Sequence, residues 1–477
     1  MKTVTMRNIF GGREFFSSML RLALPIALQN LLMAAFSLID SAMVAHLGDG
    51  AITAVNFATR WTFIMQITLF GVCSGASILY SQFWGARDHK GIRQAFGLTV
   101  LISLAVAVVF GALMATVPGA MIRVFAGHSD EESVRGVVEM GTSFLRIFVF
   151  NCPLFALNYL LAISMRSTEE VHIPLMTSVI SIAVNTGLNF VLIYGRLGVP
   201  VMGVAGAAVA TTVANLVQFV LLVALGRRRG HVLFHAVREW FEFDRRLIRK
   251  FVGVVWPVLL NEGLWVLGNS VYTFVFGRQY IAEVAAYSIY SNVDQLLFAF
   301  VIGTSNACGV LVGKAVGAGD EQEAWDNARH CLASGMLIAL GLGVLEFLLR
   351  VPLVQLIGPR SAETALLAER LLLISCFTMP LKMGSMLFIV AIFRSGGRPL
   401  VGAFIDVGCV WLIGAPLVVL AGYTWHPPFP VMFLLIFAED IVKVSVGLAV
   451  FLRRTWIRQL TNKAPEAPAL AEAGQYE

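Results

Sequence analysis

The chain has 477 residues, of which 58% are hydrophobic and only 13% are charged, and its mean hydropathy is +0.78. An average soluble protein has about 25% charged residues, so this composition excludes a soluble globular enzyme. The net charge is +6, but the basic residues lie between long apolar runs instead of forming one patch, which argues against a protein that binds nucleic acid.

Apolar runs of roughly 20 residues or more follow one another along the chain, and each is long enough to cross about 30 Å of hydrocarbon as a helix. They lie at 18–45, 52–82, 95–117, 138–164, 172–194, 203–225, 251–277, 284–314, 327–350, 366–393, 400–422 and 429–452. The pattern predicts an all-α polytopic membrane protein with twelve transmembrane helices. The first run is too long for the core of a signal peptide, so we expect it to remain in the mature protein.

The connecting segments predict the orientation, because positively charged short loops stay on the cytoplasmic side. With the first residue inside, 24 Lys and Arg residues fall in cytoplasmic segments, Arg394 and Arg398 among them, against 7 on the opposite side. We therefore expect a multi-pass protein of the cell (inner) membrane with both termini in the cytoplasm. The residues 456–477, rich in Ala and Pro, predict a disordered tail.

The longest polar connection, 226–250, divides the chain into an N-terminal lobe, 1–225, and a C-terminal lobe, 251–455, of six helices each. We expect this linker to be an amphipathic segment on the inner membrane surface. One constant shift along the chain, without gaps, places Pro25 on Pro257, Gly85 on Gly317 and Asp88 on Asp320. Because the shift spans an even number of helices, it predicts lobes of parallel topology with a pseudo-twofold axis along the membrane normal.

Further residues match a known family. They are Leu24-Pro25 and Asp40 in the first helix, Gly85-Ala86-Arg87-Asp88 and Gly317-Ala318-Gly319-Asp320 after the second and eighth helices, Asn185 and Asn189 in the fifth, and Arg394-Ser395-Gly396-Gly397 after the tenth, whose first two residues the internal repeat matches to Arg166-Ser167 after the fourth. With these motifs the chain resembles the multidrug and toxic compound extrusion (MATE) transporters. The resemblance implies two six-helix lobes around a central cavity, and export of bulky, often cationic, organic compounds in exchange for protons or sodium ions.

A charge inside the hydrocarbon costs roughly 2.5–3.5 kcal/mol on insertion scales, so each one is a candidate functional residue. The resemblance implicates an acid of the first helix in proton coupling, which here is Asp40. We expect Asp40, with Asn185 and Asn189 beside it, to take up a proton from outside and to release it when the lobe rearranges. The alternative is a structural Asp40 that only bonds groups of the fifth helix.

The second lobe offers further charges. Glu262 follows Lys250 by about three turns of helix, and Lys382 lies equally far from Arg370 and Arg394, which places both near the middle of the membrane. We expect Glu262 to take part in ion coupling and to pair with Lys382 at the cavity, either as a switch or as a permanent bridge. The substrate cavity is expected to include Lys382, Asp294 and Asp406. Glu439 and Lys443, one helical turn apart, predict a structural ion pair.

Pro25 and Pro257 fall early in the first helix of each lobe, where a missing amide bends a helix, and they are either hinges or fixed kinks. The chain has no Walker loop, zinc motif or nucleophile elbow, and His231 and His235 lack a third ligand. We therefore expect an antiporter driven by a proton or sodium gradient, not an enzyme, without metal or other cofactor.

The expected partners are the lipid bilayer and small organic substrates, with no nucleic acid, and the expected state is a monomer. Two alternatives remain open at this point. One is a flippase for lipid-linked precursors of the same superfamily, and the other is a membrane-embedded enzyme or receptor.

Overall fold

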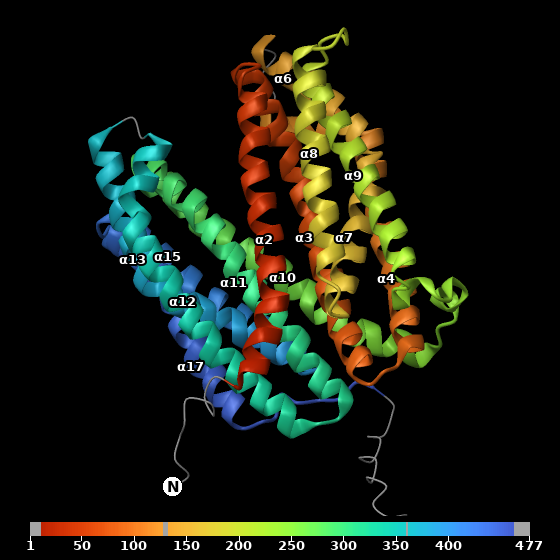
Figure 1. The fold of residues 1–477 in the computed structure, drawn as a ribbon. Helices are drawn as coiled ribbons and strands as arrows, with labels where there is room; N and C mark the ends of the chain where they lie inside the picture. Colours follow the sequence, from red (N-terminus) through yellow and green to blue (C-terminus); the bar gives the residue numbers. More distant parts are fainter. Residues whose placement is uncertain (1–10, 127–131, 359–360, 462–477) are drawn as a thin grey trace, which may run out of the picture.

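The computed structural model describes residues 11–126, 132–358 and 361–461, and the regular elements in these ranges are helices. Figure 1 shows two helical bundles that meet at the end of the molecule where the chain begins and diverge toward the opposite end. We call these ends the terminal end and the far end, and the bundles the first and second lobe. The all-α, two-lobe membrane fold predicted from the apolar pattern is confirmed.

The first lobe is followed by a short linker and then by the second lobe. The helices of the first lobe are α2 (Arg13–Ala45), α3 (Asp49–Gly85), α4 (His89–Thr116), α5 (Pro118–Ala126), α6 (Glu132–Phe148), α7 (Asn151–Ser167), α8 (His172–Tyr194) and α9 (Gly203–Arg228). The linker carries the single turns η1 (Val232–Phe234) and η2 (Val237–Phe241). The second lobe contains α10 (Arg245–Gln279), α11 (Val284–Ala318), α12 (Glu321–Ile357), α13 (Ala362–Met386), η3 (Leu387–Arg394), α14 (Pro399–Cys409), η4 (Val410–Gly414), α15 (Ala415–Leu420), η5 (Ala421–Trp425), α16 (Phe429–Ile436) and α17 (Ala438–Leu452).

In the described ranges, ten spans are long and apolar enough to cross a membrane without a sharp bend. The predicted span 138–164 is instead a helix pair that bends by 54° between Phe148 and Asn151. Pro153 lies in the first turn after this bend, where its missing amide costs no helical hydrogen bond. The predicted span 429–452 corresponds to α16 and α17, which Phe437 alone separates.

The repeated Gly-Ala-x-Asp motif ends one helix and starts the next in each lobe. Its third residue takes the left-handed conformation, with φ +53° at Arg87 and +81° at Gly319. The carboxylate that follows then caps the next helix, because Asp88 accepts a hydrogen bond from the amide of Gly91 at 2.9 Å and Asp320 accepts one from the amide of Glu323 at 2.8 Å. The motif is therefore a tight helix–helix turn at the terminal end.

The linker between the lobes packs against the first lobe. Trp240 lies edge-on to Phe96 of α4, with ring centroids 4.8 Å apart, and its indole donates to the carbonyl of Leu233 at 2.9 Å. The imidazole of His231 contacts the hydroxyl of Thr168 at 2.9 Å, and burial lowers the pKa of His231 to about 4. His231 therefore stays neutral, and its contribution to stability is lost as the pH falls from about 6.5, the ordinary pKa, toward 4.

The start of the expected disordered tail is packed in the structure, which corrects the prediction for residues 456–461. Trp456 is fully buried and donates from its indole to the carbonyl of Phe451 at 3.2 Å. The amide of Leu460 donates to the side chain of Gln82 in the first lobe at 2.8 Å. This segment therefore ties the two lobes together, whereas 462–477 lie outside the described residues.

Glycines bring the backbones of the two lobes into contact at the terminal end. A Cβ on Gly85 would overlap the carbonyl of Lys314, and one on Gly317 would overlap the carbonyl of Gln82. Side chains reinforce the contact, because Lys314 forms an ion pair of 2.8 Å with Glu169 of the first lobe. The lobes are therefore closed against each other at the terminal end.

We expect Gly317→Ala to weaken this closed contact, because its methyl group meets backbone that has no room to move. Overpacking of this kind costs about 1–3 kcal/mol. The melting temperature of the purified protein should fall. Gly277→Ala is the matched control, because a Cβ there has nothing within 4 Å. Equal melting temperatures for the two variants would contradict the close packing.

Candidate functional site

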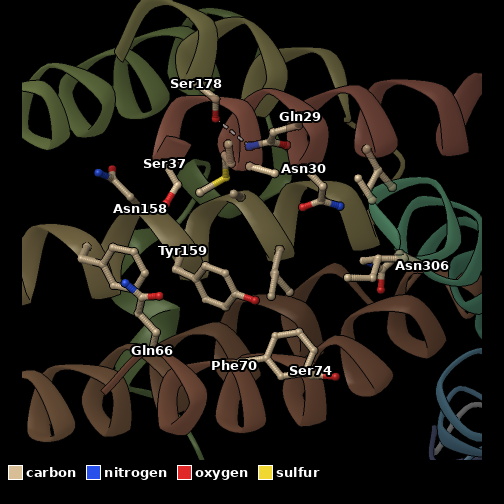
Figure 2. A pocket seen from close by; sticks show the side chains of 18 of the residues that line it. Gln29, Asn30, Ser37, Gln66, Phe70, Ser74, Asn158, Tyr159, Ser178 and Asn306 are labelled. Atoms are coloured by element: carbon tan, nitrogen blue, oxygen red, sulfur yellow. Dashed lines mark hydrogen bonds between the residues drawn. The ribbon is translucent and has the colours of Figure 1, made fainter. Parts of the chain in front are cut away.

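A cavity of about 920 Å³ runs along the inner face of the first lobe and reaches α11 and η3 of the second lobe. Along α3 it extends from Asn56, nearer the far end, to Ser81, nearer the terminal end. Figure 2 shows that amide, hydroxyl and aromatic side chains line it, with Gln29 donating to Ser178 at 2.6 Å. The rings of Phe70 and Tyr159 lie 6.5 Å apart in its wall. Such a mixed surface suits bulky organic molecules.

Asp40 lies in the wall of this cavity at the end of a hydrogen-bonded chain. The amide nitrogen of Asn189 donates to its carboxylate at 2.6 Å and to the side-chain oxygen of Asn185 at 2.8 Å. Asn185 in turn donates to the hydroxyl of Thr211 at 3.2 Å. The structure thus brings together Asp40, Asn185 and Asn189, the three first-lobe residues singled out from the sequence.

The expected ion pair between Glu262 and Lys382 is wrong. Glu262 of α10 pairs with Arg394 of η3 at 2.6 Å, and both side chains are buried. The sequence placed Arg394 in a cytoplasmic loop, but the span Ala362–Arg394 continues through η3 and brings Arg394 into the interior, where it lines the cavity. The residue counts gave the depth of Glu262 and not the direction in which its side chain points.

Lys382 pairs with Asp294 of α11 at 2.5 Å and donates to the hydroxyl of Tyr290 at 2.8 Å. Neither Lys382 nor Asp294 is among the residues that line the 920 Å³ cavity. Their pair lies within the second lobe, with Lys382 also 5.3 Å from the ring centroid of Phe437. These two of the three residues expected in the substrate cavity therefore form a separate ion pair.

Asp406, expected in the substrate cavity, does not line it and is buried in a third cluster of the second lobe. Lys443 lies 2.8 Å from Asp406 and 2.9 Å from Glu439, which includes the ion pair predicted from the spacing of Glu439 and Lys443. Tyr272 donates to Glu439 at 2.5 Å, and Asn261 donates to Asp406 at 3.1 Å. One ammonium thus holds two buried carboxylates in place.

Pro25 and Pro257 lie inside α2 and α10, which continue through them. Pro257 is buried and Pro25 is partly buried. Each proline leaves one carbonyl of the preceding turn without its helical partner, at Arg21 and at Gly253. Both prolines lie in the half of their helix near the terminal end, where the lobes touch. The hypothesis that they act as hinges stays a prediction.

The comparison with known proteins decides the family. The MatE family model matches residues 25–191 and 257–420, one match in each lobe. The chain belongs to the MATE family. The two matches begin at Pro25 and Pro257, the same two prolines that the internal repeat aligns.

Among the relatives of this MATE protein is the probable multidrug resistance protein YoeA of Bacillus subtilis, 25% identical over 85% of this chain and 87% of its own length. Another is the probable multidrug resistance protein NorM of Rhodopseudomonas palustris, 28% identical over 90% and 88% of the two chains. An outward-facing structure of a multidrug resistance MATE family transporter has the same fold, with a TM-score of 0.82, 17% identity and coverage of 95% and 98%. The chain is thus a multi-pass MATE efflux transporter.

Two features of this site were not predicted from the sequence, the amide-rich lining of the cavity and the arginines Arg166 and Arg394 in its wall. The signal for the arginines was present, because Arg166-Ser167 and Arg394-Ser395 occupy matching places in the two repeats. An arginine that recurs at the same position of both repeats is expected to have a defined position in the fold. Loop arginines that only set the orientation of the protein in the membrane need no such position.

Proposed function

We propose that this MATE transporter exports bulky organic compounds across the cell (inner) membrane in exchange for protons, and that Asp40 binds the proton. The observation that carries the proposal is the position of Asp40, a carboxylate that lines the substrate-sized cavity and forms no ion pair with a described residue. Protons and substrate then share one cavity, so that binding of one can displace the other.

The neighbours of Asp40 favour a proton over a sodium ion. Asn189 presents its NH₂ group to the carboxylate, and the oxygen of Asn185 already accepts from Asn189. A hard metal cation needs several oxygen ligands, and within the described residues no group of three carboxylate, His or Cys side chains is placed to hold a metal ion. A proton needs one carboxylate oxygen.

The orientation that we propose follows from the charged loops and the shape. With the terminal end in the cytoplasm, the lobes are in contact on the inside and diverge toward the outside (Figure 1), and we propose on this basis that the cavity opens outward. Rocking of the lobes about their contact would open it inward. The relatives named for multidrug resistance favour this exporter over a flippase for lipid-linked precursors.

The test is transport of a fluorescent organic cation by the purified chain in proteoliposomes, with proton and sodium gradients imposed separately. We expect uphill transport with the proton gradient and none with the sodium gradient. Transport driven by sodium alone would contradict the proton assignment. No transport of any organic compound under either gradient would contradict the exporter.

The prolines give a second prediction. If α2 and α10 bend during rocking, Pro25→Ala and Pro257→Ala restore a helical hydrogen bond and stiffen both helices. Turnover in proteoliposomes should then fall while the affinity for substrate changes little. Unchanged turnover in both variants would make these prolines static kinks.

A further inference from the structure

Arg166 and Arg394 occupy matching places in the two repeats and line the same cavity, but their surroundings differ. Arg394 is neutralised by Glu262 at 2.6 Å and donates to the hydroxyl of Ser74 at 3.2 Å. The Nε of Arg166 is buried and has no hydrogen-bond acceptor among the described residues, and Arg166 forms no ion pair with them. The first lobe therefore holds a cation whose partner is missing.

A residue of α2 explains why Arg166 has no carboxylate partner whereas Arg394 has one. The shift that aligns Pro25 with Pro257 also places Asn30 on Glu262, so the first lobe carries an amide where the second carries a carboxylate. The side-chain nitrogen of Asn30 is also buried without an acceptor, and Figure 2 shows Asn30 in the wall of the pocket. The Nε–H of Arg166 and the NH₂ of Asn30 can only donate hydrogen bonds, and both lack an acceptor among the described residues.

Arg166 points toward the cavity because of its place on α7. Asn158, Ala162 and Arg166 follow one another every four residues, with Tyr159 and Ile163 beside them, and all five line the cavity, so they share one face of the helix. Arg166 is partly exposed, so its guanidinium reaches the cavity space although its Nε is buried.

Among the described residues, no acid of the cavity wall forms an ion pair with Arg166. The titratable acid that lines the cavity in the described residues is Asp40, which is bonded to Asn189. Asp40 lies beyond Asn30 on α2, about 15 Å toward the far end. The half of the cavity near the terminal end, which we call the deep half, therefore carries an uncompensated positive charge in a membrane interior, where pairing is strongly favoured.

We propose that the deep half binds the carboxylate of an organic anion or zwitterion, with Arg166 as its ion-pair partner and Asn30 as a hydrogen-bond donor. Guanidinium matches a carboxylate with two parallel hydrogen bonds, and the bound group replaces the carboxylate that Glu262 supplies in the second lobe. The aromatic rings of Tyr159 and Phe70 lie in the same wall and would contact the body of the substrate. The inference rests on the proposed exporter and names its substrate class.

The experiment compares two dyes that differ in one group, a zwitterionic rhodamine with a free benzoate and the methyl ester of the same dye. Their binding to the full chain in lipid nanodiscs is measured by fluorescence anisotropy. We expect Arg166→Gln to weaken binding of the acid at least tenfold and to change binding of the ester less than twofold. Asn30→Glu, which supplies the missing carboxylate, should have the same selective effect.

Three controls separate this role from a loss of structure. Arg123→Gln removes an exposed arginine of α5 that does not line the cavity, and the ratio of the two affinities should stay at the parental value. Arg166→Lys keeps the charge and should retain part of the preference for the acid. Arg166→Gln should melt at or above the parental temperature, whereas Arg394→Gln strands Glu262 and should melt lower.

An Arg166→Gln variant with the parental ratio of affinities would overturn the inference, as would a parent that does not bind the acid. If the parent transports the ester but shows no preference for the acid, the anion site fails and the exporter stands. If the acid binds through Arg166 but no organic compound is transported, the exporter fails and the anion site stands.

Discussion

Asp40→Asn is expected to abolish uphill export while the protein still folds and binds substrate. The amide has the shape of a protonated carboxyl, and its oxygen can still accept the hydrogen bond from Asn189 that measures 2.6 Å in the parent. It cannot exchange a proton, however, so the gradient has no site on which to act. We expect export driven by a proton gradient in proteoliposomes to fall by at least a factor of about 100, equivalent to about 2.7 kcal/mol.

The matched control is Asp49→Asn, the same substitution at an exposed residue that starts α3 and does not line the cavity. Its transport rate should stay near that of the parent. An Asp40→Asn variant that still drives substrate uphill near the parental rate would remove Asp40 from the coupling mechanism.

Lys443→Met should be the most destabilising of the substitutions considered. Lys443 is buried between Asp406 at 2.8 Å and Glu439 at 2.9 Å, so its loss leaves two close carboxylates without a counter-charge. Removing one partner of a buried ion pair typically costs about 3–5 kcal/mol. We expect a large drop in the melting temperature of the purified protein.

Lys314→Met provides the comparison, because the ion pair of Lys314 with Glu169 is partly exposed, with 45% of the lysine side chain accessible. Pairs of this kind contribute about 0–1 kcal/mol. The triple variant Lys443→Met, Asp406→Asn, Glu439→Gln removes all three charges and should recover much of the stability. A Lys443→Met variant as stable as the parent would show that the cluster is not a structural element.

The sequence predicted the fold well because the features that mark membrane-spanning helices are local in the sequence. Each span needs a long apolar run, and the runs and the repeated Gly-Ala-x-Asp turns can be found without knowing which helices touch. The bend between α6 and α7 was missed for the same reason, since an apolar run of the right length does not show whether one straight helix or two shorter ones cross the membrane.

The candidate site was predicted less completely, because counting residues along a helix gives the depth of a side chain in the membrane but not the direction in which the side chain points. Counting residues placed Glu262 and Lys382 at similar depths, but their partners depend on which way each helix face points. Glu262 points to Arg394, and Lys382 points to Asp294. Asp40 was easier to interpret, because α2 and α8 bring it to Asn185 and Asn189 as the family motif implies.

Repeats carry information that single motifs lack. The alignment of the two lobes contains the match of Asn30 with Glu262 and of Arg166 with Arg394, but their meaning required the contacts. Because Glu262 neutralises Arg394, the amide at Asn30 marks a missing charge instead of an ordinary cavity residue. The anion site that we propose for the first lobe rests on this difference between the repeats.

Proton release on substrate binding is the measurement that tests the coupling of Asp40 to the cavity most directly. The purified chain in weakly buffered nanodiscs is mixed with a transported dye, and released protons are followed with a pH indicator. We predict about one proton released per dye bound by the parent, at a pH where Asp40 is protonated in the free protein, and none by Asp40→Asn with equal dye binding. Equal proton release by the two proteins would contradict the role of Asp40 in coupling. The absence of proton release from a parent that binds and exports the dye would contradict it as well.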